Sequence, residues 1–159
     1  MKIKSVKDFD ELLTLYFDDD FNEPIDKYPN WITHITFGYE FSQPVDNLPT
    51  QLTELTFGKK FNKPVDNLPS QLIHLNLGSD FNLPVDNLPE SLIYLYFSSS
   101  FNCPVDNLPN SIKIIRFDTN SNYNKELNNL PVSLEILKLP RAYKKDIKNI
   151  PLGCKIIKC

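Results

Sequence analysis

The chain has 159 residues, of which 41% are hydrophobic and 23% are charged, and its formal net charge is −3. This length and composition suit one folded domain that spans residues 1–159. The acidic balance argues against a general nucleic-acid binder. The 13 proline residues exclude a bundle of long helices and a doubly wound sheet, because proline interrupts both helix interiors and sheet ladders.

Residues 1–11 are expected to form an N-terminal cap or a partial repeat, with a short cap between Val6 and Glu11. The opening residues lack the apolar core of a signal peptide, and no apolar run approaches the ~20 residues of a membrane span. The three cysteines are odd in number and lack paired CxxC spacing. These features predict a cytoplasmic protein without a membrane partner.

A repeat begins with the phenylalanines that recur every 20 residues, namely Phe21, Phe41, Phe61, Phe81 and Phe101. The unit is F-N-x-P-V-D-N-L-P-x-S-L-x-x-L-x-F-G-x-x, and every proline except Pro140 falls in register with it. Two degenerate units begin at Tyr123 and Tyr143. Residues 12–159 are therefore expected to be repeats of about 20 residues, because internal self-similarity at this period is typical of solenoids.

Each unit contains one apolar-polar alternation, as at Leu52, Leu55 and Phe57, which is typical of a half-buried strand. Stacked units place such strands parallel and roughly 4.8 Å apart. The return segment holds two prolines, so it is expected to be extended chain with a 3₁₀ turn at Asp-Asn-Leu. The predicted fold is a repeat solenoid with one parallel β-sheet of about eight short strands, extended or 3₁₀ convex segments, and little or no α-helix.

Two asparagine series recur at fixed points of the coil and are expected to stack and satisfy backbone groups there. The aspartates that recur beside one series suggest turn formation rather than a calcium ladder, since each coil offers one carboxylate and calcium needs six or more oxygens. The series are Asn47, Asn67, Asn87 and Asn107; Asn62, Asn82 and Asn102; and Asp46, Asp66, Asp86 and Asp106.

Over residues 12–159 the unit resembles the FNIP repeat, a leucine-rich-repeat-like family of amoebal and giant-virus proteins. The usual asparagine of leucine-rich repeats is missing, and its place holds Lys60, Asp80 or Ser100. The resemblance implies an arc that recognises proteins, in the host-cell cytoplasm if the protein is viral. Family members often carry an F-box, which implies substrate recognition linked to ubiquitin pathways, but the 11 residues before the first strand leave no room for one here.

In such an arc, the strand residues outside the core form columns on the concave face. Tyrosine and arginine are enriched at binding hot spots, so Tyr94, Tyr96 and Arg116 are predicted to centre a protein-binding patch. The alternative is an ordinary exposed sheet face of cross-strand pairs. The columns are expected to end in Ile136 and Ile156, and in Lys138 and Lys158. The predicted binding residues are Tyr94, Tyr96, Arg116, His34, Glu54, His74 and Asn76.

His34, Glu54 and His74 fall in one column, which places the two histidines roughly 9–10 Å apart. A hydrogen-bonded ladder, a bridged metal ion, and weak peptide or pH sensing all remain open. No phosphate loop, HExxH or GxSxG motif is present. We therefore expect no catalytic residues, no resident metal or cofactor, and no enzyme activity.

The C-terminal region is basic and is expected to form a solvated rim, although contact with nucleic acid or an acidic protein stays open. The last strand, within 154–159, is expected to lack a polar cap and to expose an edge, which permits a homodimer. The alternative function is thus a structural or self-assembling repeat protein without a small-molecule ligand. Cys154 and Cys159 are expected to be buried there as small hydrophobic residues. The basic residues are Arg141, Lys144, Lys145, Lys148, Lys155 and Lys158.

Overall fold

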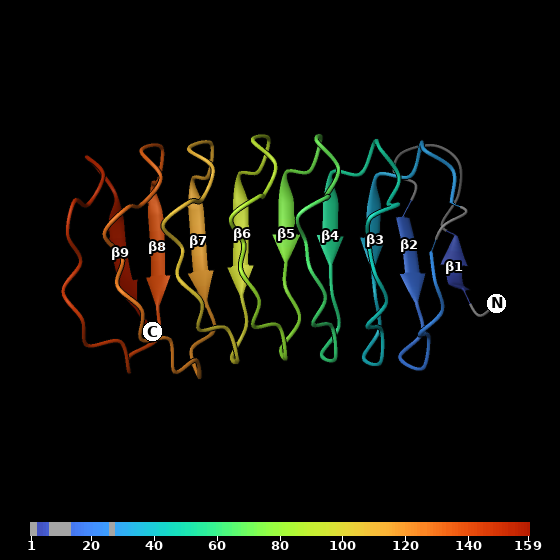
Figure 1. Cartoon of the computed structure of the whole chain (residues 1–159), viewed down its shortest axis with the longest axis horizontal. Helices are drawn as coiled ribbons and strands as arrows, with labels where there is room; N and C mark the ends of the chain where they lie inside the picture. Colours follow the sequence, from blue (N-terminus) through green and yellow to red (C-terminus); the bar gives the residue numbers. More distant parts are fainter. Residues whose placement is uncertain (1–2, 7–13, 26–27) are drawn as a thin grey trace.

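The structure is a computed structural model that describes residues 3–6, 14–25 and 28–159. Its strands form one sheet in chain order (Figure 1). The strands are β1 (Ile3–Val6), β2 (Thr14–Phe17), β3 (His34–Thr36), β4 (Glu54–Thr56), β5 (His74–Asn76), β6 (Tyr94–Phe97), β7 (Ile114–Phe117), β8 (Ile136–Leu139) and β9 (Lys155–Lys158).

Strands β2 to β9 are parallel, which confirms the predicted sheet of eight strands. A further strand, β1, pairs with β2 in the antiparallel direction at the N-terminal edge. The sequence did not predict it because β1 lies outside the repeat. Val6 of the predicted cap ends β1, and the rest of that cap lies outside the described residues. The described residues include no helix long and apolar enough to cross a membrane.

The register follows the repeat, with one exception at the last strand. His34 pairs with Glu54, 20 residues later, but Ile136 pairs with Lys155, only 19 residues later. Gly153, whose φ is 80°, precedes β9 and permits a left-handed turn in this shorter coil. The predicted column ends Ile156 and Lys158 are therefore wrong. The two columns end in Lys155 and Ile157, which pair with Ile136 and Lys138.

Each regular coil buries the same apolar side chains from its strand and from its return segment. Because one coil cannot cover these side chains alone, stacking buries them in a continuous core. The inward orientation predicted for the Phe, Val and Leu of the return segment is confirmed. In one coil the buried residues are Leu52, Leu55, Phe57, Phe61, Val65 and Leu68.

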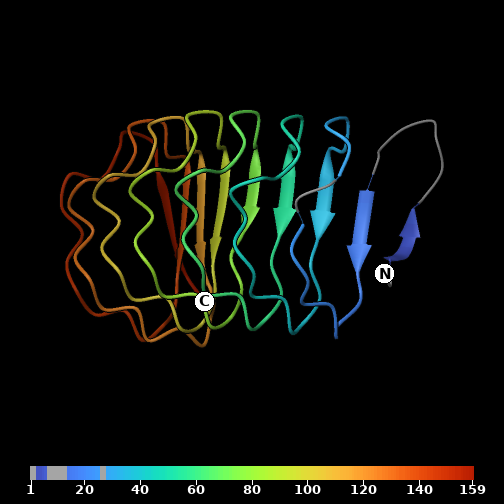
Figure 2. The same cartoon turned by 45° about the vertical axis from the view of Figure 1, so that its right-hand side comes forward.

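The stacked aromatic rings show why the solenoid curves. Neighbouring strands lie roughly 4.8 Å apart, whereas the rings of Phe41 and Phe61, on the return side, lie 6.1 Å apart, as do those of Phe61 and Phe81. Spacing that widens away from the sheet bends the stack, so the sheet lines the inner, concave side. Figure 2 shows the strands on one wall and the return segments on the other.

The return segments contain isolated turns rather than a run of 3₁₀ helix. Asp46 and Asn47 form one turn, and the amide of Leu52 donates to the carbonyl oxygen of Pro49 at 3.2 Å in the next. Turns of this kind suit a segment whose two prolines prevent a longer helix.

The predicted asparagine ladders are confirmed for one series and differ for the other. The amide N–H of Asn102 donates to Oδ1 of Asn82 at 2.8 Å, so this series satisfies backbone groups as expected. In the other series the side-chain amide of Asn107 donates to the carboxylate of Asp86 at 3.0 Å, rather than to backbone. The recurring aspartates thus accept hydrogen bonds from the next coil.

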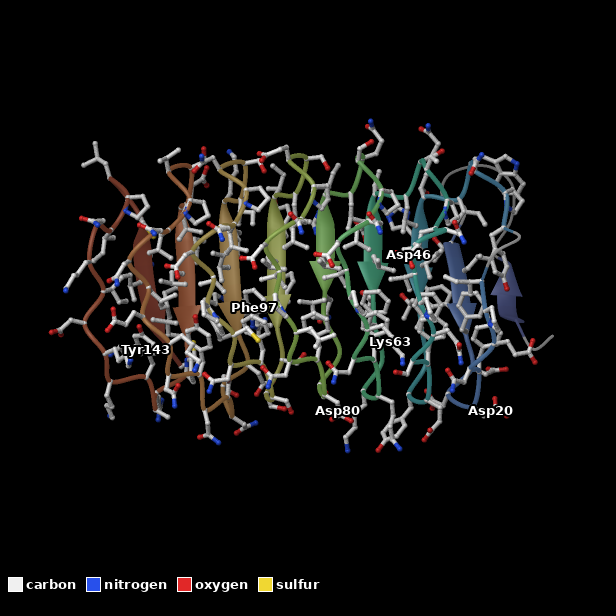
Figure 3. The ribbon with its side chains drawn as sticks, viewed as in Figure 1. Asp20, Asp46, Lys63, Asp80, Phe97 and Tyr143 are labelled. Atoms are coloured by element: carbon white, nitrogen blue, oxygen red, sulfur yellow. The ribbon has the colours of Figure 1, made fainter. Side chains whose placement is uncertain are left out.

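Close packing between coils explains the glycines that follow the strands. A Cβ on Gly58 would collide with the carbonyl oxygen of Gly38, and a Cβ on Gly78 would collide with that of Gly58. At the equivalent places in later coils, Ser98 and Asp118 are accommodated. Figure 3 shows Asp20 and Asp80, which lie in the turns beyond this point, along one edge of the solenoid.

Candidate binding site on the concave face

A hollow of about 490 Å³ lies on the concave face over β4 to β7. It brings together five of the seven predicted binding residues, whereas His34 and Tyr94 lie outside its lining. The five are Glu54, His74, Asn76, Tyr96 and Arg116. The side chains project from this face because they alternate along each strand with buried core residues such as Leu75 and Leu95.

His34 is held by hydrogen bonds on both ring nitrogens. Its Nδ1 lies 2.8 Å from the Thr33 hydroxyl, and its Nε2 lies 3.3 Å from a carboxylate oxygen of Glu54. With the Thr33 hydroxyl donating to Nδ1, the Nε2–H is directed to the Glu54 carboxylate. The first half of the predicted histidine–glutamate ladder is therefore present.

The second half of that ladder is absent. His74 forms no ion pair with Glu54 in the described residues and instead stacks on Tyr94, with ring centroids 4.1 Å apart and an interplanar angle of 13°. No group of three or more His, Cys, Asp or Glu in the described part of the chain is arranged to hold a metal ion. The column therefore consists of two separate pairs, and each pair orders its own side chains.

Tyr96, Arg116 and Lys138 form a row across three neighbouring strands. Tyr96 is the register partner of Arg116, and Arg116 is the register partner of Lys138. Neither cation forms an ion pair with any described residue. By contrast, Lys113 on the same strand as Arg116 pairs with Glu135 at 2.8 Å, and this hydrogen bond raises the pKa of Lys113.

The sequence analysis missed several residues of this surface. Thr56, Ser98 and Asp118 also line the hollow, and all three lie in columns that the repeat defines. Lys138 extends the row of Arg116 but was not included among the predicted binding residues. The signal that could have found them was column membership itself, without the added preference for aromatic and arginine side chains.

The cysteines do not contribute to this face. Cys103 is partly buried on the return side, with its Sγ 3.5 Å from Oδ1 of Asn82, and burial raises the pKa of its thiol. Burial likewise raises the thiol pKa of Cys154, which packs partly against the core. The expected burial of Cys159 is wrong, since this residue lies beyond β9 and is exposed. Thiols with raised pKa values are poor nucleophiles at neutral pH.

Comparison with known proteins agrees with this architecture. The family model of the FNIP repeat matches residues 21–60, 44–80 and 81–120. No curated protein matches the chain. Among solved structures, the chain resembles CroV588, a giant-virus protein described as a novel circular LRR protein structure, with a TM-score of 0.74 and 32% sequence identity. That match covers 100% of this chain and 29% of the CroV588 chain. This chain belongs to the FNIP repeat family, and its repeats build a solenoid like that of leucine-rich-repeat proteins.

Proposed function

We propose that this chain is a non-enzymatic protein-interaction module that binds a protein partner through its concave face. FNIP repeats and LRR-like solenoids are typically scaffolds of this kind. The observation that carries the proposal is the hollow over β4 to β7, which is lined by side chains that the repeat does not constrain. The repeated core maintains the scaffold, and the variable face selects the partner.

The tyrosines supply the expected binding energy. Tyr94 and Tyr96 are half-buried, so their rings are already partly ordered before a partner arrives. The stack of His74 on Tyr94 further restricts that ring. Preordered aromatic side chains lose little conformational entropy on binding and often carry much of the interface energy.

Capture from a host-cell lysate tests this proposal. The Tyr94→Ala/Tyr96→Ala variant should recover at least about tenfold less of the partner than the wild type, as expected for a hot spot. The matched control is Tyr39→Ala, because Tyr39 is an exposed tyrosine in the turn after β3. Equal recovery by the wild type and the double variant, with both folded by circular dichroism, would contradict the proposal.

A link to ubiquitin pathways is a narrower form of the same proposal and is supported by family resemblance alone. If the module selects substrates for a ubiquitin ligase, the captured proteins should include a ligase subunit together with a second protein. Quantitative mass spectrometry of the captured set measures both. Recovery of a partner without any ligase subunit would remove the ubiquitin link and leave the interaction module in place.

Self-assembly is the second candidate, and it is favoured by the free edge of β9, which pairs only with β8 among the described strands. A two-fold pairing centred on β9 would be antiparallel and would set Lys155 against Lys158 of a second copy. Like charges directly opposite each other destabilise a strand pair. Light scattering that shows a dimer at high concentration would support this candidate, whereas a monomer would argue against it.

A further inference from the structure

We propose that the concave face binds an acidic segment of its partner, with Asp or Glu carboxylates held by Arg116 and Lys138. This inference rests on the proposed function and specifies the chemistry of the partner. Arg116 and Lys138 are register partners on β7 and β8, so their side chains leave the sheet roughly 4.8 Å apart. Two neighbouring cations at this spacing can contact one carboxylate or two successive acidic side chains.

The positive charge at this point is not neutralised within the described residues. The neighbouring outward position on the same two strands holds Lys113 and Glu135, whose charged atoms lie 2.8 Å apart. Arg116 and Lys138 have no such partner, although Asp118 lines the same hollow two residues beyond Arg116. The face therefore keeps two cations available for an external anion.

Charge changes along the face in a way that orients such a ligand. Over β4 and β5 the outward residues are polar or acidic, with Glu54 half exposed. Over β7 to β9 they include Arg116, Lys138 and Lys155. An extended segment that crosses the strands would thus place its acidic part over β7 and β8, away from Glu54, because charge complementarity fixes register.

The surroundings strengthen carboxylate binding at this position. Ile114 and Ile136 are half-buried register partners in the adjacent column, so the cations rise beside apolar surface. An ion pair next to apolar surface is less screened than one in bulk water. Arginine also offers a planar pair of N–H donors that match a carboxylate, and the hydroxyl of the neighbouring Tyr96 can add a hydrogen bond.

Selection from a displayed library of random peptides tests the inference with the full chain immobilised. We expect the wild type to enrich peptides with clustered Asp and Glu. The Arg116→Gln/Lys138→Gln variant, which keeps side-chain size, should bind the best of these peptides at least about tenfold more weakly in titration. The affinity of the wild type should also fall as sodium chloride is raised.

A charge-matched control separates local recognition from net charge. Lys144→Gln/Lys145→Gln removes the same two charges from exposed positions outside the concave face, and it should leave peptide affinity unchanged. An equal loss in this control would overturn the inference. So would tighter binding of a single-stranded oligonucleotide than of the acidic peptides at Arg116 and Lys138.

The outcomes distinguish this inference from the proposed function. Enrichment of peptides without acidic residues, bound in a manner that Tyr94→Ala/Tyr96→Ala abolishes, would overturn the inference and support the interaction module. Selected peptides that respond neither to the tyrosine variants nor to the charge variants would overturn both.

Discussion

The coils of residues 21–117 and those of residues 118–159 build the same cross-section with different contacts. Phe61 and Phe81 stack at 6.1 Å in the first region, and Tyr123 and Tyr143 stack at the same 6.1 Å in the second. Figure 3 shows Phe97 near the middle of the solenoid and Tyr143 toward its C-terminal end. The apolar spacing is therefore preserved where the side-chain identity is not.

The polar contacts differ more between the two regions. The asparagine ladder of the first region ends where Asn124 donates its backbone N–H to Asn102, and Lys144 takes the next place. In the last coil the amide of Asn149 donates to the carbonyl oxygen of Asn128, and the ammonium of Lys158 donates to that of Tyr143. The comparison teaches that core spacing sets the coil, whereas several polar contacts can serve each turn.

The largest expected effect comes from removing a core ring in the regular region. Phe61→Ala should lower the free energy of unfolding by about 3–5 kcal/mol, because Phe61 is fully buried and stacks on rings from its own coil and both neighbours. Tyr143→Ala should cost less, since it perturbs one end of a stack held by nearest-neighbour contacts. Urea denaturation measures both losses, and equal losses would show that the two regions do not differ in this way.

The next effect concerns close packing between coils. Gly58→Ala should lower the free energy of unfolding by about 2–3 kcal/mol, because the added Cβ collides with the backbone of the preceding coil. Ser98→Ala is the matched control at the equivalent place. It keeps a Cβ and loses a hydrogen bond of 2.6 Å from Oγ to the Leu77 carbonyl oxygen, which costs about 1 kcal/mol. A Gly58→Ala variant as stable as the wild type by thermal denaturation would contradict the packing argument.

The two C-terminal tyrosines should respond in opposite directions to the loss of their hydroxyls. The buried Tyr123 hydroxyl has no hydrogen-bond partner, so Tyr123→Phe should raise the free energy of unfolding by about 1–2 kcal/mol. The Tyr143 hydroxyl donates to the Lys125 carbonyl oxygen at 3.1 Å, so Tyr143→Phe should lower it by about 1 kcal/mol. Changes of the same sign in both variants would contradict this assignment.

Tyr123 also predicts a loss of stability in alkali. Burial raises the pKa of Tyr123 above its ordinary value of 10.0. Above pH 10 the unfolded chain can ionise this hydroxyl while the folded chain keeps it neutral, so folding becomes less favourable as pH rises. Denaturation at pH values below and above 10 should show a smaller loss for Tyr123→Phe than for the wild type.

The smallest expected effect separates the two asparagine ladders. Asn82→Ala removes the acceptor for the Asn102 backbone N–H and should cost about 1 kcal/mol. Asn107→Ala removes only an exposed contact with Asp86 and should cost less than about 0.5 kcal/mol. Chemical denaturation of the two variants side by side measures the difference, and a larger loss for Asn107→Ala would reverse the assignment.

The fold was largely predictable because the repeat states each core position several times. The error at Ile156 and Lys158 arose where this redundancy ends. Ile156 and Ile157 are both apolar, so the pattern does not distinguish the inward residue once the coil is one residue shorter. Strand β1 was missed for a related reason, since it shares no residues with the repeat.

The candidate site was predictable only as a set of columns. Column membership placed Glu54, His74 and Asn76 on one face, and the structure gathers them in one hollow. It did not determine that His74 would stack on Tyr94 rather than approach Glu54, because that choice depends on side-chain rotamers and on neighbouring coils.

The sequence by itself determined the period, the buried residues and the direction of the strands, because an apolar pattern repeated every 20 residues has one consistent way to bury itself. Only the tertiary structure decided the curvature, the final register and the pairing of side chains across coils. Those properties depend on distances between residues about 20 positions apart, such as the unpaired Arg116 and its neighbour Lys138, and a linear pattern carries no such distances.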